Sequence, residues 1–203
     1  MTLHKILDYF EPSRILDIGA NIGQFRTIAQ QTFPNSYIFS IEASPDCEVH
    51  LARITDQYKI TLLSKDNSEY SFYGRKGYPT ATGNSIYKEL TPFYSDDQLE
   101  VRKVMGSRLD DLFSLEDNFD LIKIDTQGSE LDIIEGGKEL CKKAKAILLE
   151  VSYTEYNLDA PLVEEVIEYM QNFGFIPSKV LDEQRNHGSH QEDILFLNSR
   201  YDI

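Results

Sequence analysis

"RILDIGANIGQF", residues 14–25, is the stretch that decides the fold of this chain. Its first half is an apolar run that predicts a buried strand, and Gly19 predicts a tight turn directly after that strand. Gly23 opens a helical pattern over residues 23–33, which Pro34 ends. A strand, a glycine turn and a helix in this order are typical of α/β proteins that bind a ligand beyond the carboxyl end of the strand.

The same alternation continues along the chain and predicts a largely parallel sheet with right-handed crossovers. Further strands are predicted at 36–44, 58–64, 69–74, 99–105, 119–125 and 144–152, a short helical turn at 107–113, and helices at 45–54, 129–144 and 160–174. Ser44 is a candidate cap for the helix that Pro45 opens, and the glycine pair 136–137 is expected to shorten or bend the helix 129–144. Two strands in succession, 175–181 and 191–198, predict a C-terminal antiparallel hairpin.

Two segments lie outside this alternation. Residues 1–12 predict a short amphipathic helix on the domain, with Leu3, Ile6, Leu7 and Phe10 as its apolar residues. Residues 74–98 are rich in glycine, proline and aromatic residues without a clear period, and they predict a loop insertion. The whole chain, 1–203, is expected to form a single domain.

The composition favours a cytoplasmic protein that acts on a small molecule. The net charge of -14 argues against nucleic acid as a partner, because phosphate binding needs a clustered basic surface. No apolar run approaches the roughly 20 residues that span a membrane, and the first residues lack the apolar core of a signal peptide. Cys47 and Cys141 are far apart and have no partner at metal-ligand spacing, so zinc is not expected.

The first motif restricts the cofactor. A dinucleotide site favours G-x-G-x-x-G, and the middle glycine that admits a pyrophosphate is absent between Gly19 and Gly23. S-adenosylmethionine carries positive charge, which Asp17 complements at the end of the first strand. Glu42 ends the second strand, where its two oxygens can accept both ribose hydroxyls. The alternative for both acids is an ordinary structural role at a turn.

A second motif, "LIKIDTQGSELDII" at 121–134, also ends an apolar strand in polar residues. Lys123 lies inside this strand and needs a charged partner, which Asp125 or a neighbouring acid can provide. Ser129 is a candidate cap for the next helix, and the helix dipole is expected to favour the charged form of Glu130. The polar residues 64–67 after the third strand are candidates for an adenine pocket through Ser64 and Asp66, or form a plain hairpin turn.

Several segments together resemble FkbM-type methyltransferases, which are S-adenosylmethionine-dependent enzymes of the class I fold. These segments are "ILDIGANIGQF", "IEASPDCEVHL", "TGNSIY", "SRLDDL", "LIKIDTQGSELDIIEGG", "ILLEVS" and "QEDILFL", in the family's order over about residues 13–198. The resemblance implies a three-layer, Rossmann-like α/β fold with a mostly parallel seven-stranded sheet in the order 3-2-1-4-5-7-6. In the family a proline usually follows the acid of the second strand, whereas Ala43 follows Glu42 here, which leaves the acceptor open.

The resemblance also assigns roles to residues. Asp125 is the first choice for the base that takes the acceptor's proton, Glu150 the second and Glu130 a weaker third. The expected cofactor site comprises Asp17, Gly19, Ala20, Asn21, Gly23, Phe25, Glu42, Ala43, Ser44, Ser64, Asp66 and Gln127. The expected substrate contacts are Asn84, Ser85, His187 and His190, and the two histidines have solvated loop positions as their alternative.

The implied reaction is O-methylation of a small hydroxylated molecule, such as a sugar, a glycan precursor or a natural product. The expected metal content is none, although Asp125 and Glu150 together with an oxygen of the substrate leave Mg²⁺ as an alternative. Two other functions stay open at this stage, a nucleotide-binding oxidoreductase and a non-catalytic binding protein with a Rossmann-like fold. The acceptor and the number of subunits do not follow from these patterns.

Overall fold

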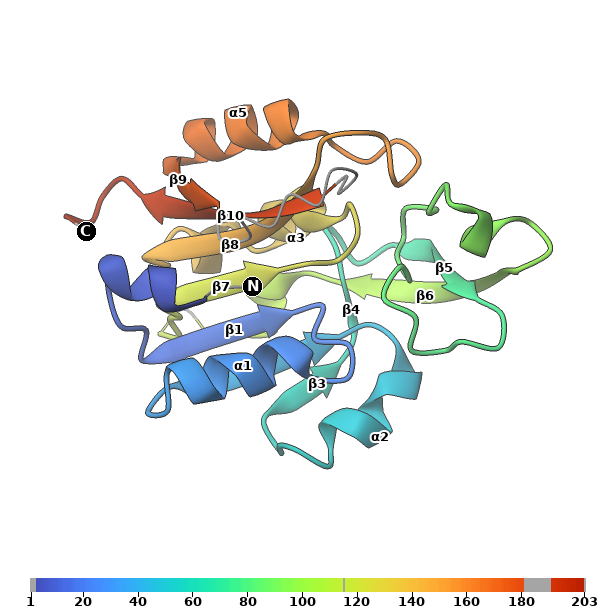
Figure 1. The fold of residues 1–203 in the computed structure, drawn as a ribbon, viewed down its shortest axis with the longest axis horizontal. Helices are drawn as coiled ribbons and strands as arrows, with labels where there is room; N and C mark the ends of the chain where they lie inside the picture. Colours follow the sequence, from blue (N-terminus) through green and yellow to red (C-terminus); the bar gives the residue numbers. More distant parts are fainter. Residues whose placement is uncertain (1–2, 115, 181–190, 203) are drawn as a thin grey trace.

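The computed structural model describes residues 3–114, 116–180 and 191–202, and its centre is a seven-stranded sheet (Figure 1). The strand order is β3-β2-β1-β7-β8-β10-β9, and β10 runs antiparallel to both of its neighbours. These strands are β1 (Arg14–Ile18), β2 (Tyr37–Glu42), β3 (Tyr58–Ile60), β7 (Leu121–Ile124), β8 (Ala146–Ser152), β9 (Phe175–Val180) and β10 (Gln191–Asn198). The predicted α/β class, strand order and C-terminal hairpin are therefore confirmed.

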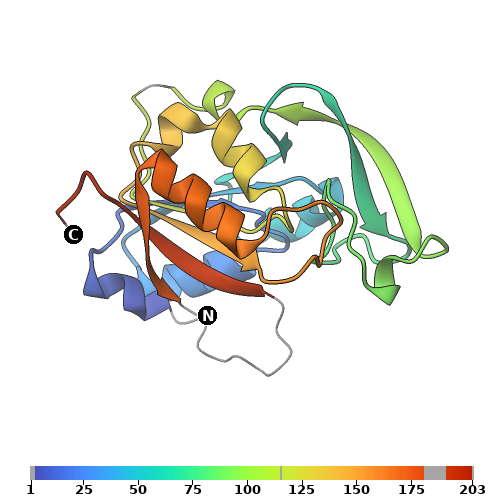
Figure 2. The same ribbon diagram turned by 90° about the horizontal axis from the view of Figure 1, so that it is seen from above.

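Helices cover both faces of this sheet and complete three layers (Figure 2). The 3-10 helix η1 (Leu3–Asp8) and α1 (Gln24–Thr32) pack on one face. The other face is covered by α3 (Glu130–Gly136), α4 (Lys138–Cys141) and α5 (Val163–Phe173). Each face buries its own cluster of apolar side chains, as expected for a central sheet whose strands are buried on both sides.

Side chains alternate between the two faces along the central strands. In β7, Leu121 packs in the cluster under α1, whereas Ile122 and Ile124 pack in the cluster under α3 to α5. Strand β1 follows the same rule, with Ile15 on the α1 side and Leu16 on the other. The intervening charged residues of both strands therefore share the α1 face.

A second, three-stranded sheet begins beyond the carboxyl ends of the main strands, and its two longer strands lie at the right of Figure 1. It has the order β4-β6-β5, with β4 (Leu62–Leu63), β5 (Glu69–Arg75) and β6 (Leu99–Ser107). The prediction of one strand over 58–64 is wrong, because the chain leaves the main sheet after β3 and enters the small sheet at β4. Thr61 lies at this transition: its N–H donates to the Glu42 carbonyl oxygen at 2.8 Å, while its hydroxyl lies 3.0 Å from that of Ser107.

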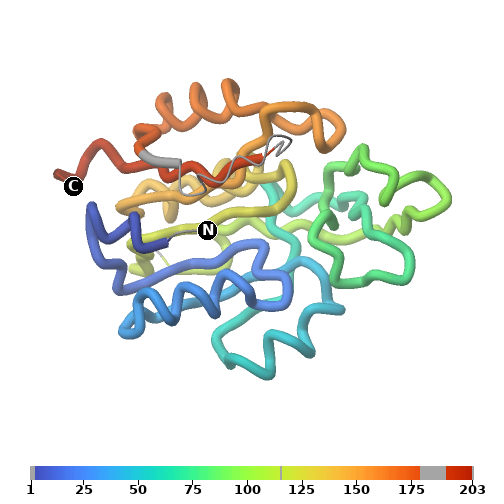
Figure 3. Tube along the Cα trace, viewed as in Figure 1, coloured from blue at the N-terminus to red at the C-terminus, as the bar shows by residue number. Residues whose placement is uncertain are grey.

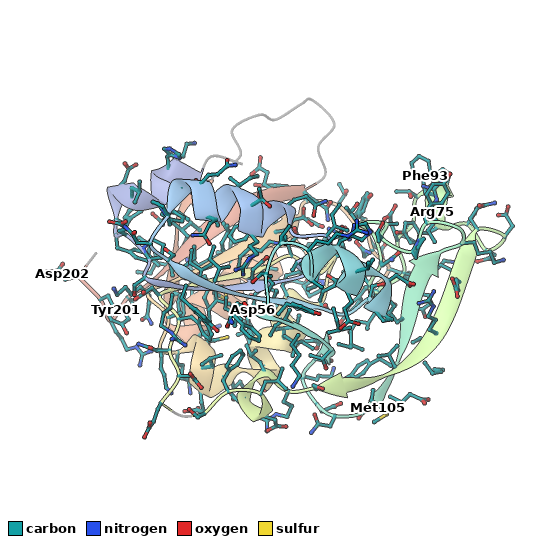
Figure 4. All side chains as sticks on the ribbon, turned by 90° about the horizontal axis from the view of Figure 1, so that it is seen from below. Asp56, Arg75, Phe93, Met105, Tyr201 and Asp202 are labelled. Atoms are coloured by element: carbon teal, nitrogen blue, oxygen red, sulfur yellow. The ribbon has the colours of Figure 1, made fainter. Side chains whose placement is uncertain are left out.

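The insertion 74–98 connects β5 to β6 and forms the loops at the right of the Cα trace in Figure 3. It contains the 3-10 helix η3 (Pro92–Tyr94). At its outer end the Arg75 guanidinium lies 4.0 Å from the ring centroid of Tyr78 and 4.8 Å from that of Phe93. Figure 4 shows Arg75 and Phe93 next to each other at this end, far from Tyr201 and Asp202.

The helices differ from the predictions mainly at their ends. The predicted helix 45–54 is two short pieces, η2 (Pro45–Cys47) and α2 (Glu48–Leu51), and 107–113 contributes η4 (Leu109–Asp111). The predicted break at the glycine pair 136–137 is confirmed, since α3 ends and α4 begins there. Neither predicted side-chain cap forms, because the hydroxyls of Ser44 and Ser129 bond elsewhere.

The N-terminal segment follows its prediction in part. Leu3 and Ile6 are buried under the sheet, but Leu7 is 44% exposed because η1 is a 3-10 helix and turns this residue outward. Across the parts of the chain that the structure describes, no helix is both long enough and apolar enough to cross a membrane.

Candidate active site

A cavity of about 280 Å³ lies where the carboxyl ends of β1, β2 and β7 meet the small sheet. Most of the predicted cofactor residues line it together with the first candidate base. The predicted cofactor residues on the wall are Gly19, Ala20, Asn21, Phe25, Glu42, Ala43 and Gln127. The wall also includes the candidate base Asp125 and two predicted substrate residues, Asn84 and Ser85. The cavity therefore joins the two motifs that are about a hundred residues apart in the sequence.

Gly19 brings the turn after β1 against the end of β7. Its φ is +75°, and a Cβ at this position would lie 1.8 Å from the carbonyl oxygen of Asp125. A side chain at residue 19 is thus excluded by the neighbouring turn as well as by the backbone conformation. Gly23 is the N-cap residue of α1 and is absent from the cavity wall, and its N–H donates to the Ala20 carbonyl oxygen at 2.8 Å.

Glu42 ends β2 as a nearly buried carboxylate on the cavity wall. One carboxylate oxygen accepts a hydrogen bond from the Asn21 N–H, and the other accepts one from the Ser44 N–H, each at 2.8 Å. Burial raises the pKa of Glu42, and these backbone donors oppose the shift. Because a carboxylate oxygen can accept two hydrogen bonds, each oxygen keeps one acceptor position for a ligand.

Lys123 satisfies the prediction that a lysine within this strand needs a charged partner. Its ammonium nitrogen lies 3.2 Å from a carboxylate oxygen of Asp125 and 3.7 Å from one of Asp17. Lys123 lines the cavity, whereas Asp17 is fully buried and is absent from the cavity wall. The structure thus places Asp17 behind Lys123, with no direct contact to a ligand in the cavity.

Asp125 and Glu150 are connected through Gln127. The side-chain amide of Gln127 donates to a carboxylate oxygen of Asp125 at 3.2 Å and also to Glu150. Glu150 does not line the cavity, and burial among the acids Asp125, Glu130 and Asp193 raises its pKa well above the ordinary value. Of the two first candidates for the base, Asp125 alone faces the cavity.

The Glu130 side chain accepts hydrogen bonds from the backbone of the turn that follows β7. One carboxylate oxygen accepts hydrogen bonds from the N–H groups of Thr126 at 2.8 Å and Gly128 at 3.2 Å. Burial nevertheless raises the pKa of Glu130 to about 7, so the expectation that its position in the first turn favours the charged form is wrong. The cost of removing the carboxylate from water exceeds the gain from the helix dipole and the backbone donors.

The insertion is fastened to this turn through Ser85. Its hydroxyl lies 2.8 Å from the carbonyl oxygen of Thr126 and 2.9 Å from that of Gln127, and the Tyr87 N–H donates to it. Gln127 has a φ of +57°, which is uncommon for a residue with a side chain. The side chain of Asn84 bonds within the insertion, to Arg75, Tyr94 and Pro79, and the residue lines the same cavity.

Five predicted cofactor residues are absent from the wall of the main cavity: Asp17 and Gly23, described above, and Ser44, Ser64 and Asp66. Two predicted substrate residues lie outside the described residues. Ser64 and Asp66 are absent from the wall, and Asp66 instead accepts hydrogen bonds from the Ser68 N–H and the Tyr70 hydroxyl, both at 2.9 Å. The segment is thus a structural turn, although not the hairpin turn of the alternative, because β6 lies between β4 and β5 in the small sheet. Ser44 contacts Glu42 instead, because its N–H donates to the Glu42 carboxylate at 2.8 Å. His187 and His190 fall in the stretch 181–190, which the structure does not describe.

Among the described residues, no group of three or more histidine, cysteine, aspartate or glutamate side chains has the geometry to hold a metal ion. The acids at this edge are instead bonded to Lys123, to Gln127 and to backbone N–H groups.

The sequence patterns did not identify the apolar and threonine wall of the cavity. It includes Gln24, Ile28, Thr61, Leu62, Leu63, Phe72, Thr82, Ile86 and Ile133. The sequence did contain a signal for Thr61 to Leu63. They follow β3, which runs parallel to β2, so they lie at the same edge of the main sheet as Glu42. Phe72 and Thr82 reach the wall only through the small sheet, which no local pattern predicted.

The chain is similar in sequence to known proteins. The model of the methyltransferase FkbM domain matches residues 17–177. A curated relative, 2-O-methyltransferase NoeI of Sinorhizobium fredii, is 26% identical over 205 aligned residues, which cover 92% of this chain and 79% of that protein.

Solved structures agree in fold. The methyltransferase FkbM from Methylobacillus flagellatus matches with a TM-score of 0.56 and 14% identity over 96% of this chain, which spans only 47% of the length of that chain. Magnesium protoporphyrin IX methyltransferase from Synechocystis, solved with bound S-adenosylmethionine, matches with a TM-score of 0.54 and 9% identity, over 97% of this chain and 74% of the other. The family model covers most of the residues that build the cavity, and the chain belongs to the FkbM methyltransferase family.

Proposed function

We propose that this protein is an S-adenosylmethionine-dependent O-methyltransferase whose acceptor is a small hydroxylated molecule, such as a sugar, a glycan precursor or a natural product. The observation that carries the proposal is the single cavity that Glu42 and Asp125 both line at the carboxyl edge of the sheet. The printed activity of the curated relative, a 2-O-methyltransferase, supports oxygen as the methyl acceptor. Family membership favours methyl transfer over the oxidoreductase and the non-catalytic binding protein.

The donor set of the cavity suits S-adenosylmethionine. Glu42 would hold the ribose hydroxyls through the remaining acceptor position of each oxygen, and Gly19 lets the ligand approach the backbone closely. Leu62, Leu63 and Ile133 supply an apolar wall for the adenine ring. When bound, S-adenosylmethionine supplies a methyl group on a positively charged sulfur.

The residues of the chain account for the remaining requirements of the reaction. The new bond joins the methyl carbon to the acceptor oxygen as the carbon–sulfur bond breaks and its electron pair stays on sulfur. Asp125 takes the proton of the acceptor hydroxyl, while Lys123 and Gln127 hold its carboxylate in place. Alignment of donor and acceptor contributes most of the rate, up to about 7–11 kcal/mol in favourable systems.

Glu150 and Glu130 are assigned supporting roles in this proposal. The raised pKa of Glu150 favours its protonated form, which limits the repulsion between it and Asp125 across Gln127. Glu130 keeps the turn of residues 126–128 in shape through its hydrogen bonds to backbone N–H groups. The buried, unbridged thiols of Cys47 and Cys141 support the cytoplasm as the compartment.

Titration calorimetry with S-adenosylhomocysteine tests the cofactor assignment. We expect the unaltered protein to bind it and Glu42→Gln to bind about 10- to 100-fold more weakly, because a charged acceptor is lost. Asp117→Asn, at an exposed ion pair with Arg14, is the matched control and should bind normally. An unaltered protein that does not bind at millimolar ligand would contradict the proposal.

A transfer assay tests the base. The protein is incubated with a methyl-labelled donor and pooled carbohydrate and metabolite extracts, and labelled products are counted. We expect Asp125→Asn to abolish labelling while S-adenosylhomocysteine binding stays within about tenfold of the unaltered protein. Full labelling by this variant would remove Asp125 as the base and leave the cofactor assignment intact.

A further inference from the structure

Lys123 is a buried lysine in a central strand, and it forms part of the cavity wall. Its side chain is 4% exposed, and the cavity that it lines is the one proposed for a positively charged donor. A cation is costly to bury without partners, and beside a sulfonium it would repel the ligand. Its presence therefore needs a physical reason.

Two carboxylates share this cation. The ammonium nitrogen lies 3.2 Å from Asp125 and 3.7 Å from Asp17, and it donates to the Gly19 carbonyl oxygen at 3.3 Å. The ring of Phe25 lies beneath it, with the centroid 5.4 Å away. With both aspartates ionised, this lysine and its two partners sum to a net charge of -1 at the cavity.

Asp17 makes few other contacts. One of its oxygens accepts a hydrogen bond from the Ser40 hydroxyl at 3.3 Å, while Oδ1, which faces Lys123, has no hydrogen-bond partner among the described residues. Asp17 is fully buried and off the cavity wall, so a ligand in the cavity does not reach it. Asp17 therefore acts as a second counter-ion for Lys123.

Charged groups from the surrounding elements act on these three residues. Burial raises the pKa of Asp17, and Asp125 adds to that shift, whereas Lys123, the Ser40 hydroxyl and Arg26 of α1 oppose it. Asp193 of β10 favours the charged form of Lys123, and the charge of Lys123 opposes the rise in the pKa of Glu42 and of Glu150. Burial opposes the charge of Lys123, yet Asp125 and Asp17 together raise its pKa above the ordinary value. Lys123 therefore stays protonated throughout the range in which methyltransferases are assayed.

We infer that Lys123 is a positioning residue that holds the Asp125 carboxylate in place at the cavity, and that Asp17 shares the charge of Lys123 so that the three residues keep one net negative charge opposite the sulfonium. A one-to-one pair of Lys123 with Asp125 would be neutral and would add no net attraction for the donor to that of Glu42 on the same wall. The second acid restores that attraction without contacting the ligand. This inference rests on the proposed function.

The affinity ratio of S-adenosylmethionine to S-adenosylhomocysteine measures this charge. The two ligands differ by one methyl group and one positive charge, so the ratio reports the field at the sulfur and is little affected by general damage to the site. We expect Asp17→Asn to lower the ratio by about tenfold at pH 7.5 while S-adenosylhomocysteine binds as before.

Lys123→Met adds a dependence on pH. Without the lysine, two acids are left with no cation between them, and one of them takes up a proton as the pH falls. We expect the ratio to be nearly constant between pH 5.5 and 8.5 for the unaltered protein, and to fall by up to about tenfold per pH unit over part of this range for Lys123→Met.

Lys145→Met is the matched control. Lys145 also pairs with an aspartate, Asp120 at 3.0 Å, and its ammonium group also lies over a ring, that of Phe10 at 5.5 Å, but it lies at the opposite edge of the sheet. This variant should keep the normal ratio at every pH. If Lys123→Met does not fold, Asp17→Asn alone decides the question.

The outcomes separate two failures. An unchanged, pH-independent ratio in Asp17→Asn and Lys123→Met, with only a lower unfolding midpoint, would show that the three residues are a structural ion pair and would overturn this inference alone. An unaltered protein that binds neither ligand would overturn the proposed function, and the inference with it.

Discussion

Replacing Gly19 by alanine tests how closely the two site motifs are packed. Gly19 has a φ of +75°, and an added Cβ would lie 1.8 Å from the Asp125 carbonyl oxygen, whereas ordinary contacts of a Cβ begin at 3.4 Å. The turn after β1 or the end of β7 must therefore move by more than 1 Å. That movement changes the cavity at the point where Asp125 faces it.

Gly77 offers a matched control for the backbone cost. Its φ is +73°, and an added Cβ would find nothing within 4 Å. Alanine at either position costs about 1–2 kcal/mol for the left-handed conformation. Gly19→Ala pays in addition about 1–3 kcal/mol for overpacking, so we expect a loss of about 2–5 kcal/mol in the free energy of unfolding.

Urea unfolding followed by far-ultraviolet circular dichroism measures both losses, since the chain has no tryptophan to report on unfolding. Calorimetry with S-adenosylhomocysteine measures the cavity, and we expect Gly19→Ala to bind at least tenfold more weakly, with Gly77→Ala unchanged. Equal losses of stability in the two variants, within about 0.5 kcal/mol, would refute the close approach of the two turns.

Two further predictions concern the turn that follows β7. Burial raises the pKa of Glu130 to about 7 from 4.5, so the folded state binds its proton more tightly than the unfolded state does. The unaltered protein should then lose about 2–3 kcal/mol of stability relative to Glu130→Gln between pH 4.5 and 7.5, measured by urea unfolding; parallel profiles would contradict a buried, ionising Glu130. Ser85→Ala removes the hydroxyl that bonds the carbonyl oxygens of Thr126 and Gln127, and should cost about 1–2 kcal/mol and weaken S-adenosylhomocysteine binding. Ser95→Ala, at an exposed hydroxyl within the insertion, should change neither quantity.

Much of the main sheet was predictable because its signals are local. Each strand of the sheet carries its own apolar run, and the glycine turn after β1 appears directly in the sequence. The strand order came from the family resemblance. The positions of Glu42 and Asp125 at one edge then follow, because parallel strands end on the same side.

The small sheet was not predictable in the same way. Strand β5 pairs with β6 across the whole insertion 74–98, and β4 is only two residues long, so neither pairing leaves a local pattern. The cavity wall supplied by Phe72 and Thr82 was missed for this reason.

The electrostatics of the acids also depended on the tertiary structure. The position of Glu130 in the first turn of a helix indicates a stabilised charge, but the packing around the turn removes the solvent that such a charge needs. Asp17 was expected to meet the donor directly, and the structure instead gives it Lys123 as its partner, because both side chains lie on the α1 face of the sheet. The face of the sheet to which each side chain points was predictable. That Lys123 lines the cavity while Asp17 lies buried behind it was not predictable.

The passage of the chain from one sheet to the other at Thr61 has a consequence for engineering. One side of the cavity belongs to the main sheet, and the other belongs to the small sheet and its insertion. We therefore expect an exchange of segment 74–98 between relatives to alter the acceptor, provided that the carbonyl oxygens of Pro79 and Thr80 keep their hydrogen bonds from Ser44 and Asn21 on the donor side. A graft of this kind must keep a hydroxyl at residue 85, since that group connects the exchanged module to the turn beside Asp125.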